Sequence, residues 1–313
     1  MKRDIIEVTD LKEAEIRFLL SRAFAIKKNP KKYSKSLSGK ILAMIFHKPS
    51  TRTRVSFEAG MLQLGGEAIN LTSSELQLSR GEAIKDTAKT LSGYVDAIMI
   101  RTTKDEDIFE LAKWADIPVI NGLSKSFHPC QALSDIFTVC EAKGLDEAGV
   151  LDFDFSTLKI VFVGDANNVS RSLLNLSTIL NFKFGIAGPE EFKFSDEEIL
   201  RAQEKNKNVY YSKDVNDCFF KDADFVYTDV WTSMGDEAQE EKRKRMFEKY
   251  QINEKLLSKF EKNVFVMHCL PARRGQEITD EVIDGKNSII FEQAHNRMHF
   301  QKALLHWLLT DGK

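Results

Sequence analysis

Short runs rich in valine, isoleucine and phenylalanine recur along the whole chain, and segments of helical length separate them. This alternation is typical of parallel strands that are joined by helical crossovers. We therefore expect an α/β fold with two doubly wound parallel-sheet (Rossmann-like) domains. The expected strands are residues 41–47, 67–71, 97–101, 118–121, 158–164, 184–187, 208–211, 225–228, 264–268 and 289–292.

The length of the chain, 313 residues, exceeds what one hydrophobic core usually organises, which favours two domains. Residues 143–157 carry glycines and acidic residues with little periodicity, and we place the domain boundary in this stretch. Residues 296–309 have the spacing of an amphipathic helix. We predict one domain over residues 1–145, a second over 146–293, and a C-terminal helix within 294–313 that packs back on the first domain.

The charges of the chain nearly balance, with 45 Lys+Arg against 47 Asp+Glu and a formal net charge of -2. No basic excess is available for non-specific binding to DNA or RNA, so nucleic acid is not an expected partner. The chain starts without the apolar stretch of a secretory signal, and its longest apolar runs are strand-sized, so no membrane is expected. Residues 237–249 are dense in mixed charge and are expected to form a solvated helix or surface loop.

Cysteine spacing also limits the possible functions. None of the four cysteines stands in a CxxC or metal-ligand spacing, and a chain of this size needs no disulfides. We interpret them as reduced thiols in a cytoplasm, and we expect no metal. They are Cys130, Cys140, Cys218 and Cys269.

A turn rich in hydroxyl groups and arginines follows the first expected strand. Residues 49–54 read Pro-Ser-Thr-Arg-Thr-Arg, and apolar residues at helical spacing come next. Ser50 is a good N-cap, and the free N–H groups of the first helical turn would lie beside Arg52 and Arg54. Such a helix start is suited to binding a phosphate. An isolated Ser-Thr-Arg would be better interpreted as an ordinary capped helix, but three hydroxyls and two guanidinium groups together favour an anion site.

Two further polar motifs follow strands of the first half. Ligands of α/β folds bind beyond the carboxyl ends of the strands, so Arg101 would emerge near the phosphate site, although a structural ion pair explains it equally well. His128 and Gln131 are three residues apart, and a helix that starts at Pro129 would place both side chains on one side. Together they can donate hydrogen bonds to a carbonyl oxygen that gains charge.

The second half offers a different set of polar groups. Asp165-Ala166-Asn167-Asn168 follows a strand and Gly164. A dinucleotide fingerprint needs three glycines and only Gly164 is present, so NAD binding is disfavoured. Later strands end beside Asp229 and Cys269, which supply a carboxylate and a thiol. Taken singly, Asn168 is more typical of a turn, Asp229 of an N-cap and Cys269 of a buried core thiol than of a binding site.

In this order along the chain, the motifs resemble those of the aspartate/ornithine carbamoyltransferase superfamily, and among its members the ornithine carbamoyltransferases. The resemblance covers essentially the whole chain. Ser233-Met234-Gly235 and Cys269-Leu270 resemble the ornithine enzymes, whereas aspartate enzymes are expected to have a lysine within 77–82 and a different residue at position 269. The motifs that carry the resemblance are residues 50–53, 77–82, 101–102, 128–131, 165–168, 229, 233–235, 268–271 and Arg297.

The resemblance implies that the first domain binds carbamoyl phosphate, the second binds L-ornithine, and the active site lies in the cleft between them. It also implies transfer of the carbamoyl group to the side-chain amine of ornithine, which gives L-citrulline and phosphate in arginine biosynthesis. The implied carbamoyl-phosphate contacts are Ser50, Thr51, Arg52, Thr53, Gln77, Arg101, His128, Pro129, Cys130, Gln131, Cys269, Leu270 and Arg297. The implied ornithine contacts are Asn168, Asp229, Ser233 and Met234. The implied catalytic residues are Arg101, His128, Gln131, Cys269 and Arg297.

The resemblance further implies a homotrimer in which Gln77 reaches the active site of a neighbouring subunit, and it implies no cofactor. Three alternatives remain at this point: a carbamoyltransferase for another amine such as putrescine, a non-catalytic anion-binding protein, and a nicotinamide-dependent oxidoreductase. The oxidoreductase lacks its glycine fingerprint. Arg171, which follows the Asp-Ala-Asn-Asn motif, is assigned no role.

Overall fold

The chain forms two compact units in a computed structural model, which describes residues 2–72, 75–77, 81–232 and 237–311. The first unit comprises Met1–Asp152 together with His295–Lys313, and the second comprises Phe153–Ala294. The domain boundaries predicted from the sequence lie after residues 145 and 293.

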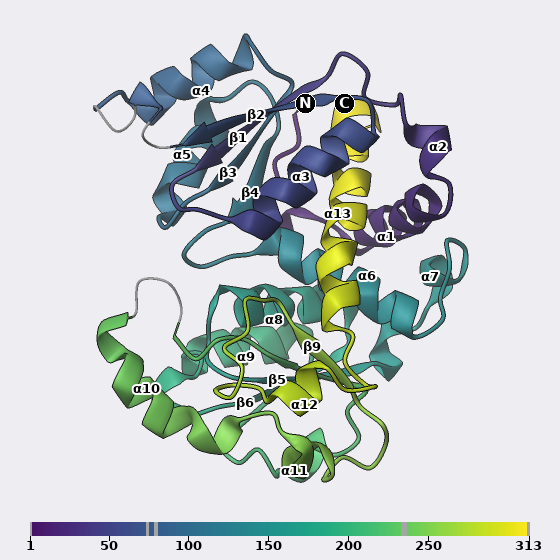
Figure 1. The fold of residues 1–313 in the computed structure, drawn as a ribbon, viewed down its shortest axis with the longest axis vertical. Coiled ribbons are helices and arrows are strands. Elements are labelled where there is room, and N and C mark those ends of the chain that lie inside the picture. Colours follow the sequence, from purple (N-terminus) through teal and green to yellow (C-terminus); the bar gives the residue numbers. More distant parts are fainter. Residues whose placement is uncertain (1, 73–74, 78–80, 233–236, 312–313) are drawn as a thin grey trace. The chain divides into compact units, whose positions relative to one another are not determined.

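The first unit is built on a four-stranded parallel sheet in the order β2-β1-β3-β4 (Figure 1). Side chains alternate between the two faces of a strand, and both faces are covered here. Ala43 and Ile45 pack with Ile108 of α5 on one face, while Leu42 and Met44 are fully buried on the other. The strands are β1 (Ile41–Phe46), β2 (Glu67–Thr72), β3 (Ala97–Arg101) and β4 (Val119–Leu123).

Helices connect these strands in the α/β pattern that the sequence predicts. The α-helices of the first unit are α1 (Glu13–Lys28), α2 (Pro30–Tyr33), α3 (Thr51–Gln63), α4 (Ile84–Ser92), α5 (Asp105–Trp114), α6 (Pro129–Ala142) and α7 (Gly149–Asp152). A 3-10 turn, η1 (Val8–Asp10), precedes them. The last α-helix of the chain, α13 (Ile290–His306), ends in this unit and continues as a π-turn, η8 (Trp307–Asp311).

The second unit has a five-stranded parallel sheet in the order β7-β6-β5-β8-β9. Its strands are β5 (Lys159–Val163), β6 (Lys183–Ala187), β7 (Val209–Ser212), β8 (Phe225–Thr228) and β9 (Phe265–His268). Its α-helices are α8 (Asn168–Leu180), α9 (Asp196–Lys205), α10 (Glu240–Phe247), α11 (Glu254–Leu257) and α12 (Asp280–Ile283). Its 3-10 turns are η3 (Phe155–Thr157), η4 (Glu190–Phe192), η5 (Cys218–Phe220), η6 (Glu237–Gln239) and η7 (Glu248–Tyr250). The parallel sheet confirms the fold class expected from the strand-helix alternation.

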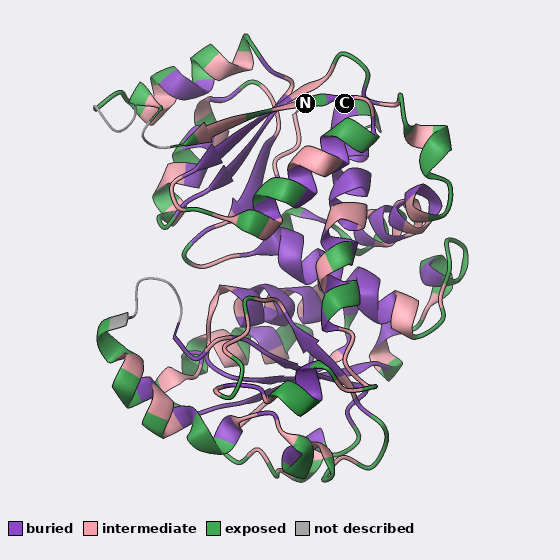
Figure 2. Cartoon of the chain, in the orientation of Figure 1, coloured by how far each residue is buried: buried purple, intermediate pink, exposed green. Residues whose placement is uncertain are grey.

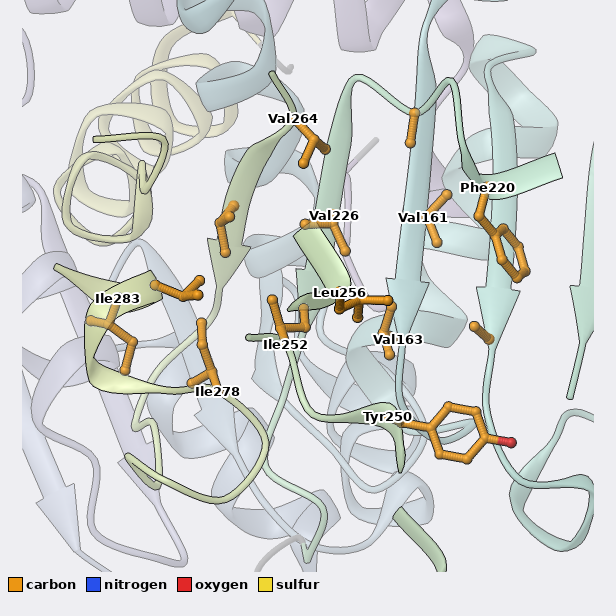
Figure 3. Packing of buried hydrophobic residues seen from close by; sticks show 14 of the residues in the cluster. Val161, Val163, Phe220, Val226, Tyr250, Ile252, Leu256, Val264, Ile278 and Ile283 are labelled. Atoms are coloured by element: carbon orange, nitrogen blue, oxygen red, sulfur yellow. The ribbon is translucent and has the colours of Figure 1, made fainter. Parts of the chain in front are cut away.

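A continuous cluster of apolar side chains packs on one face of the second sheet. Val161 and Val163 of β5 are two residues apart and point to the same side, where Val226 of β8 joins them (Figure 3). Ile252 and Leu256 cover this row. Figure 2 shows the strands of both sheets mainly buried, while the surface helices are exposed on one side and buried on the other. The strand ends that carry polar side chains are therefore held on a rigid base.

The prediction of a strand over residues 289–292 is wrong, because α13 begins at Ile290. Pairing with β9 occurs only briefly, where the Ile289 N–H bonds to the Val266 oxygen at 3.0 Å. The Gln293 N–H already donates to the Ile289 oxygen at 2.8 Å, which is a helical bond. A short apolar run cannot be distinguished from the start of a buried helix by periodicity alone.

The helix expected over residues 296–309 is present as α13 up to His306 and continues as η8, but it is not amphipathic, because no residue of this range is exposed. Positions 300–309 are buried on every side, polar Gln301 and Lys302 included. The mixed-charge run does form a mainly exposed helix, α10, although Arg243 within it is buried. Among the described residues, no helix is both long and apolar enough to span a membrane.

Candidate active site

The turn after β1 forms the predicted capped helix start. The Ser50 hydroxyl accepts a hydrogen bond from the Thr53 N–H at 3.3 Å, and α3 begins at Thr51. Thr51 is exposed, Arg52 is half-buried and Thr53 is buried. The N–H groups of this first turn lack partners within the helix, so together with Arg52 they form an anion-attracting end.

The Thr53 hydroxyl joins two buried arginines. Arg101, the last residue of β3, donates from Nη1 to Thr53 Oγ1 at 3.3 Å, and Arg297 of α13 donates from Nη2 to the same oxygen at 3.2 Å. These bonds use both lone pairs of the hydroxyl oxygen, so the Thr53 proton can be donated to a ligand. Arg297 is 244 residues away in sequence from Thr53, and the sequence offered only the family resemblance as a reason to include it.

Positive charge is concentrated at this point of the first unit. Burial, followed by the nearby Arg297 and Arg52, lowers the pKa of Arg101 to about 10. A pKa of 10 still leaves the guanidinium group protonated at neutral pH. Buried like charges repel one another, and a bound anion would relieve the repulsion through charge-assisted hydrogen bonds.

His128 and Gln131 lie beside these arginines, as the spacing in the sequence predicts. His128 is the N-cap position of α6, and Pro129 is its first residue. Burial lowers the pKa of His128 well below 6.5, and Arg297, Arg101 and Arg52 lower it further, so the imidazole is neutral at pH 7. Gln131 Oε1 accepts a hydrogen bond from Arg297 Nη1 at 2.6 Å. A neutral imidazole and an amide can hold a carbonyl or amide group without adding charge.

Three other residues implied by the resemblance have different surroundings. Cys130 is fully buried, its thiol contacts the Asn121 oxygen at 3.4 Å, and burial raises the thiol pKa to about 12. This thiol is therefore not a nucleophile at neutral pH. Gln77, by contrast, is exposed in the single chain. Pro129 is buried at the start of α6.

The second unit gathers a carboxylate, an amide and a thiol. Asp229 follows β8 and is nearly buried; its Oδ2 accepts from Asn167 Nδ2 at 2.9 Å. Asn167 is the N-cap of α8, where its oxygen accepts from the N–H groups of Val169 and Ser170, and Asn168 is the first residue of that helix. The Asn-x-x-Ser spacing is a capping-box pattern that could have identified Asn167 from the sequence. Ser233 and Met234 lie outside the described residues.

Cys269 follows β9 and is half-buried. Its sulfur, a carboxylate oxygen of Asp229 and a ring nitrogen of His268 lie within 4.8 Å of one another, a spacing that a metal ion could use. However, His268 Nδ1 accepts from the Leu270 N–H at 2.8 Å, and its Nε2 faces Glu277 Oε1 at 3.0 Å. Both ring nitrogens are engaged, so this arrangement holds the loop rather than a metal.

The loop after His268 has an unusual backbone. Leu270 has a φ of 56°, in the left-handed region that residues other than glycine rarely adopt. Residues held in such conformations are concentrated at ligand-binding sites, because the surrounding contacts must enforce them. The buried His268 ring supplies one of these contacts through the Leu270 N–H. Its partner Glu277, fully buried, was not predicted from the sequence.

Two arginines of the second unit are structural. Arg171 donates to Glu198 at 3.0 Å and thus ties α8 to α9, which answers the question left by the sequence. Arg243 of α10 forms a buried ion pair with Asp165 at 2.7 Å and also donates to the Trp231 oxygen at 2.7 Å. Burial raises the pKa of Asp165 to about 6, while Arg243 opposes that rise.

Comparisons with known proteins agree with this arrangement of groups. Residues 3–141 match the carbamoyl-P binding domain of the aspartate/ornithine carbamoyltransferases, and residues 156–308 match their Asp/Orn binding domain. An ornithine carbamoyltransferase of Bacillus subtilis is 47% identical over 315 residues, which cover 99% of this chain and 95% of the relative. The one from Methanosarcina mazei is 48% identical, with coverage of 97% and 98%.

Solved structures of similar proteins have the same fold. The ornithine carbamoyltransferase from Pyrococcus furiosus superimposes with a TM-score of 0.91 at 44% identity, covering 99% of this chain and 98% of that one. The anabolic ornithine carbamoyltransferase from Campylobacter jejuni does so with a TM-score of 0.88 at 39% identity, covering 98% and 99%.

Proposed function

Because the chain belongs to the aspartate/ornithine carbamoyltransferase family, we propose that it transfers the carbamoyl group of carbamoyl phosphate to the side-chain amine of L-ornithine. The products are L-citrulline and phosphate. The observation that carries this proposal is the opposite character of two sets of side chains. The first unit concentrates buried cations around Thr53, and the second presents the carboxylate of Asp229 beside Cys269.

The first unit is proposed to bind carbamoyl phosphate. The α3 N-terminus, with Ser50, Thr51 and Arg52, would hold the phosphate through N–H groups, hydroxyls and a guanidinium group. Thr53, Arg101 and His128 would donate to the carbonyl oxygen as it gains negative charge. Gln131 would accept from the carbamoyl NH₂, and Arg297 supports this group from α13. Pro129 and Cys130 would contribute through their positions at the start of α6.

The second unit is proposed to bind ornithine. Asn168, Asp229, Ser233 and Met234 are the proposed contacts, and the Asp229 carboxylate suits the positively charged side-chain amine. Cys269 and the carbonyl oxygen of Leu270 would face the reacting groups. The bond between Asn167 and Asp229 supports this assignment, because it fixes the carboxylate in one orientation.

The chemistry requires positioning and charge stabilisation, with no covalent enzyme intermediate. An amine of this kind has a pKa of roughly 10.4, so the amine must lose a proton before it can attack the carbonyl carbon. Asp229 and Cys269 would hold the amine, and the carbon–nitrogen bond forms as the bond from carbon to the phosphate oxygen breaks. The proton that the amine loses before attack would pass to solvent. The departing phosphate, which is doubly charged and adjacent, would take the second proton, which the attacking nitrogen gives up once it is bonded to carbon.

The decisive experiment measures carbamoyl transfer from carbamoyl phosphate by the purified protein. Ornithine, putrescine and aspartate are each tested as the acceptor, and citrulline is the product expected from ornithine. We expect kcat/KM for ornithine to exceed that for each of the others. Carbamoyl transfer to putrescine or aspartate at a higher kcat/KM would refute the assignment of the acceptor. No transfer to any of the three acceptors would refute the activity itself.

We also propose that the enzyme runs in the biosynthetic direction, in a cytoplasm where its cysteines stay reduced. The Campylobacter jejuni relative, described as anabolic, supports the direction, and four free cysteines support a reducing compartment. Saturation curves for carbamoyl phosphate and for citrulline with phosphate would test the direction. A higher kcat/KM for citrulline breakdown would refute it.

A homotrimer with shared active sites is the proposed assembly. Gln77 is exposed in the single chain, which suits a residue that reaches carbamoyl phosphate bound by the Arg52 of a neighbouring subunit. Arg52→Ala and Gln77→Ala chains, each impaired alone, should then complement each other when they are unfolded together and reassembled. For equal random mixing in a closed ring, about one quarter of the sites should be restored. An active monomer, or a mixture with only the average activity of the two variants, would refute sharing.

A further inference from the structure

Gln131 lies between two groups that leave its side-chain amide only one orientation. Its Oε1 accepts from Arg297 Nη1 at 2.6 Å, and its Nε2 donates to Asp135 Oδ1 at 2.8 Å. A guanidinium group offers only donors and a carboxylate offers acceptors. In a flipped amide, the NH₂ group would face the guanidinium donors and the oxygen would face the carboxylate oxygens. All three side chains are at least 97% buried, so water cannot readily compensate for such a mismatch.

The fixed orientation presents an acceptor towards the cation cluster. An amide oxygen has two lone pairs, and Arg297 uses one of those on Gln131 Oε1. Arg297 also donates to Thr53 Oγ1 at 3.2 Å, so the Gln131 oxygen lies on the side of the groups that are proposed to hold the acyl phosphate. The remaining lone pair can therefore accept a hydrogen bond from a ligand.

Asp135 is held in place by local geometry. It lies four residues after Gln131 on α6, and side chains with this spacing meet on one face of a helix. Unlike Arg297, it approaches Gln131 from the Nε2 end of the amide, opposite the Thr53 side. Asp135 can thus act on a ligand through Gln131.

We propose that Asp135 is a positioning residue that gives this half of the active site its preference for a carbamoyl over an acetyl group, an inference that rests on the proposed function. Carbamoyl phosphate has an NH₂ group where acetyl phosphate has a methyl group. With Gln131 fixed, the NH₂ group donates to Oε1. The methyl group cannot donate, and it leaves a buried oxygen with an unused lone pair, which sites of this kind penalise.

The test compares two ligands in the full-length enzyme, with KM for carbamoyl phosphate and the competitive inhibition constant of acetyl phosphate measured in the citrulline assay. Asp135→Leu keeps the branched shape of the side chain and removes the acceptor. The ratio of interest is the inhibition constant of acetyl phosphate divided by KM for carbamoyl phosphate. We expect Asp135→Leu to lower this ratio about tenfold. The change should come mainly from a weaker interaction with carbamoyl phosphate.

Two further variants separate positioning from a general structural role. Asp135→Asn retains an oxygen that can accept from Gln131 Nε2, so its ratio should stay within about twofold of the wild type. Thr138→Val is a matched control, because Thr138 is a buried polar residue of the same helix that bonds to Asn296 and Ser134 rather than to Gln131. Its ratio should be unchanged.

A double-mutant comparison keeps the proposal testable even if Asp135→Leu folds poorly. Gln131→Ala should lower the ratio about tenfold alone, and adding Asp135→Leu should change it little further. The proposal would be overturned by an unchanged ratio in Gln131→Ala or by equal weakening of both ligands in Asp135→Leu. It would also be overturned if Asp135→Asn lowered the ratio as much as Asp135→Leu. A wild-type protein that makes no citrulline would instead overturn the proposed function.

Discussion

The two units solve opposite electrostatic problems with similar architecture. In the first, a capped helix start and the end of a parallel strand bring Thr53, Arg101 and Arg297 together, and the neighbours that most affect the pKa of Arg101 are cations. In the second, another capped helix start and another strand end bring Asn167 and Asp229 together. Under the proposed function, similar backbone geometry would serve an anion in one unit and an amine in the other, with different side chains.

The difference also lies in how each charge is supported. Asp229 receives a neutral donor, the Asn167 amide, whereas Arg101 is stabilised by a hydroxyl and destabilised by other arginines. The positive charges around Thr53 in the first unit therefore repel one another until an anion binds. The second keeps a carboxylate ready with its orientation fixed. We expect substitutions in the first unit to have the larger effects on ligand affinity.

The largest effect is expected for Arg52→Ala. It removes a half-buried guanidinium group beside the start of α3, so KM for carbamoyl phosphate should rise roughly hundredfold. Arg52→Lys should recover only part of the loss, because a point charge cannot copy the planar fork. Steady-state kinetics would measure both, and near-normal saturation by carbamoyl phosphate in Arg52→Ala would contradict the assignment.

Asp229→Asn and Cys269→Ala should affect the other substrate. We expect KM for ornithine to rise roughly tenfold or more, with KM for carbamoyl phosphate changed much less, because both residues belong to the second unit. Asp284→Asn is the matched control, since Asp284 is an exposed partner of Arg274 in the same unit. Equal losses for both substrates would refute the division of labour between the units.

A smaller effect, on stability, follows from His128. Its pKa is well below 6.5 in the folded chain, chiefly because of burial, so the unfolded chain binds a proton that the folded chain does not. The contribution of His128 to the pH dependence is absent well above pH 6.5. Below pH 6.5 it lowers the free energy of unfolding by up to about 1.4 kcal/mol per pH unit, until the pH reaches the lower pKa of the folded chain.

Urea unfolding of wild-type and His128→Gln protein at pH 7.5, 6.5 and 5.5 would measure this contribution. The wild type should lose more of its free energy of unfolding than the variant below pH 6.5. A separate NMR titration should find the imidazole neutral at pH 5.5. Parallel pH profiles for the two proteins would contradict the expectation.

The smallest effects concern the two helix caps. Ser50→Ala and Asn167→Ala should each lower the free energy of unfolding by about 1 kcal/mol, because each removes an acceptor for N–H groups of a first helical turn. Asn167→Ser should keep the cap but not the reach to Asp229. It should therefore retain stability while KM for ornithine rises a few-fold, by roughly the strength of one hydrogen bond. Unchanged ornithine kinetics in Asn167→Ser would show that the Asn167 contact does not position Asp229.

Local spacing explains what the sequence could predict. The capping role of Ser50 and the common side of His128 and Gln131 both depend on positions within one helical turn, and the structure has them as expected. The bonds from Arg297 to Gln131 and from Asn167 to Asp229 span 166 and 62 residues, and no periodicity encodes them. The helix start at Ile290 was missed because its apolar run looks alike in a strand and in a buried helix.

The division of the chain has a consequence for the order of folding. The first unit is completed by His295–Lys313, so its chain is interrupted by the whole of the second unit. Synthesis proceeds from the N-terminus, and domains usually fold as their residues emerge. Folding of the first unit can therefore be completed only after α13 has been synthesised. Until then, the apolar surface that later buries Phe300 and Leu304 is exposed.

Arg297 arrives with that helix. The arginine cluster is therefore assembled only after the second unit has been synthesised, and a chain truncated before α13 would hold Thr53, Arg101 and His128 without the guanidinium group that bonds to Thr53 and Gln131. Partly synthesised chains would expose hydrophobic surface and lack a complete anion site.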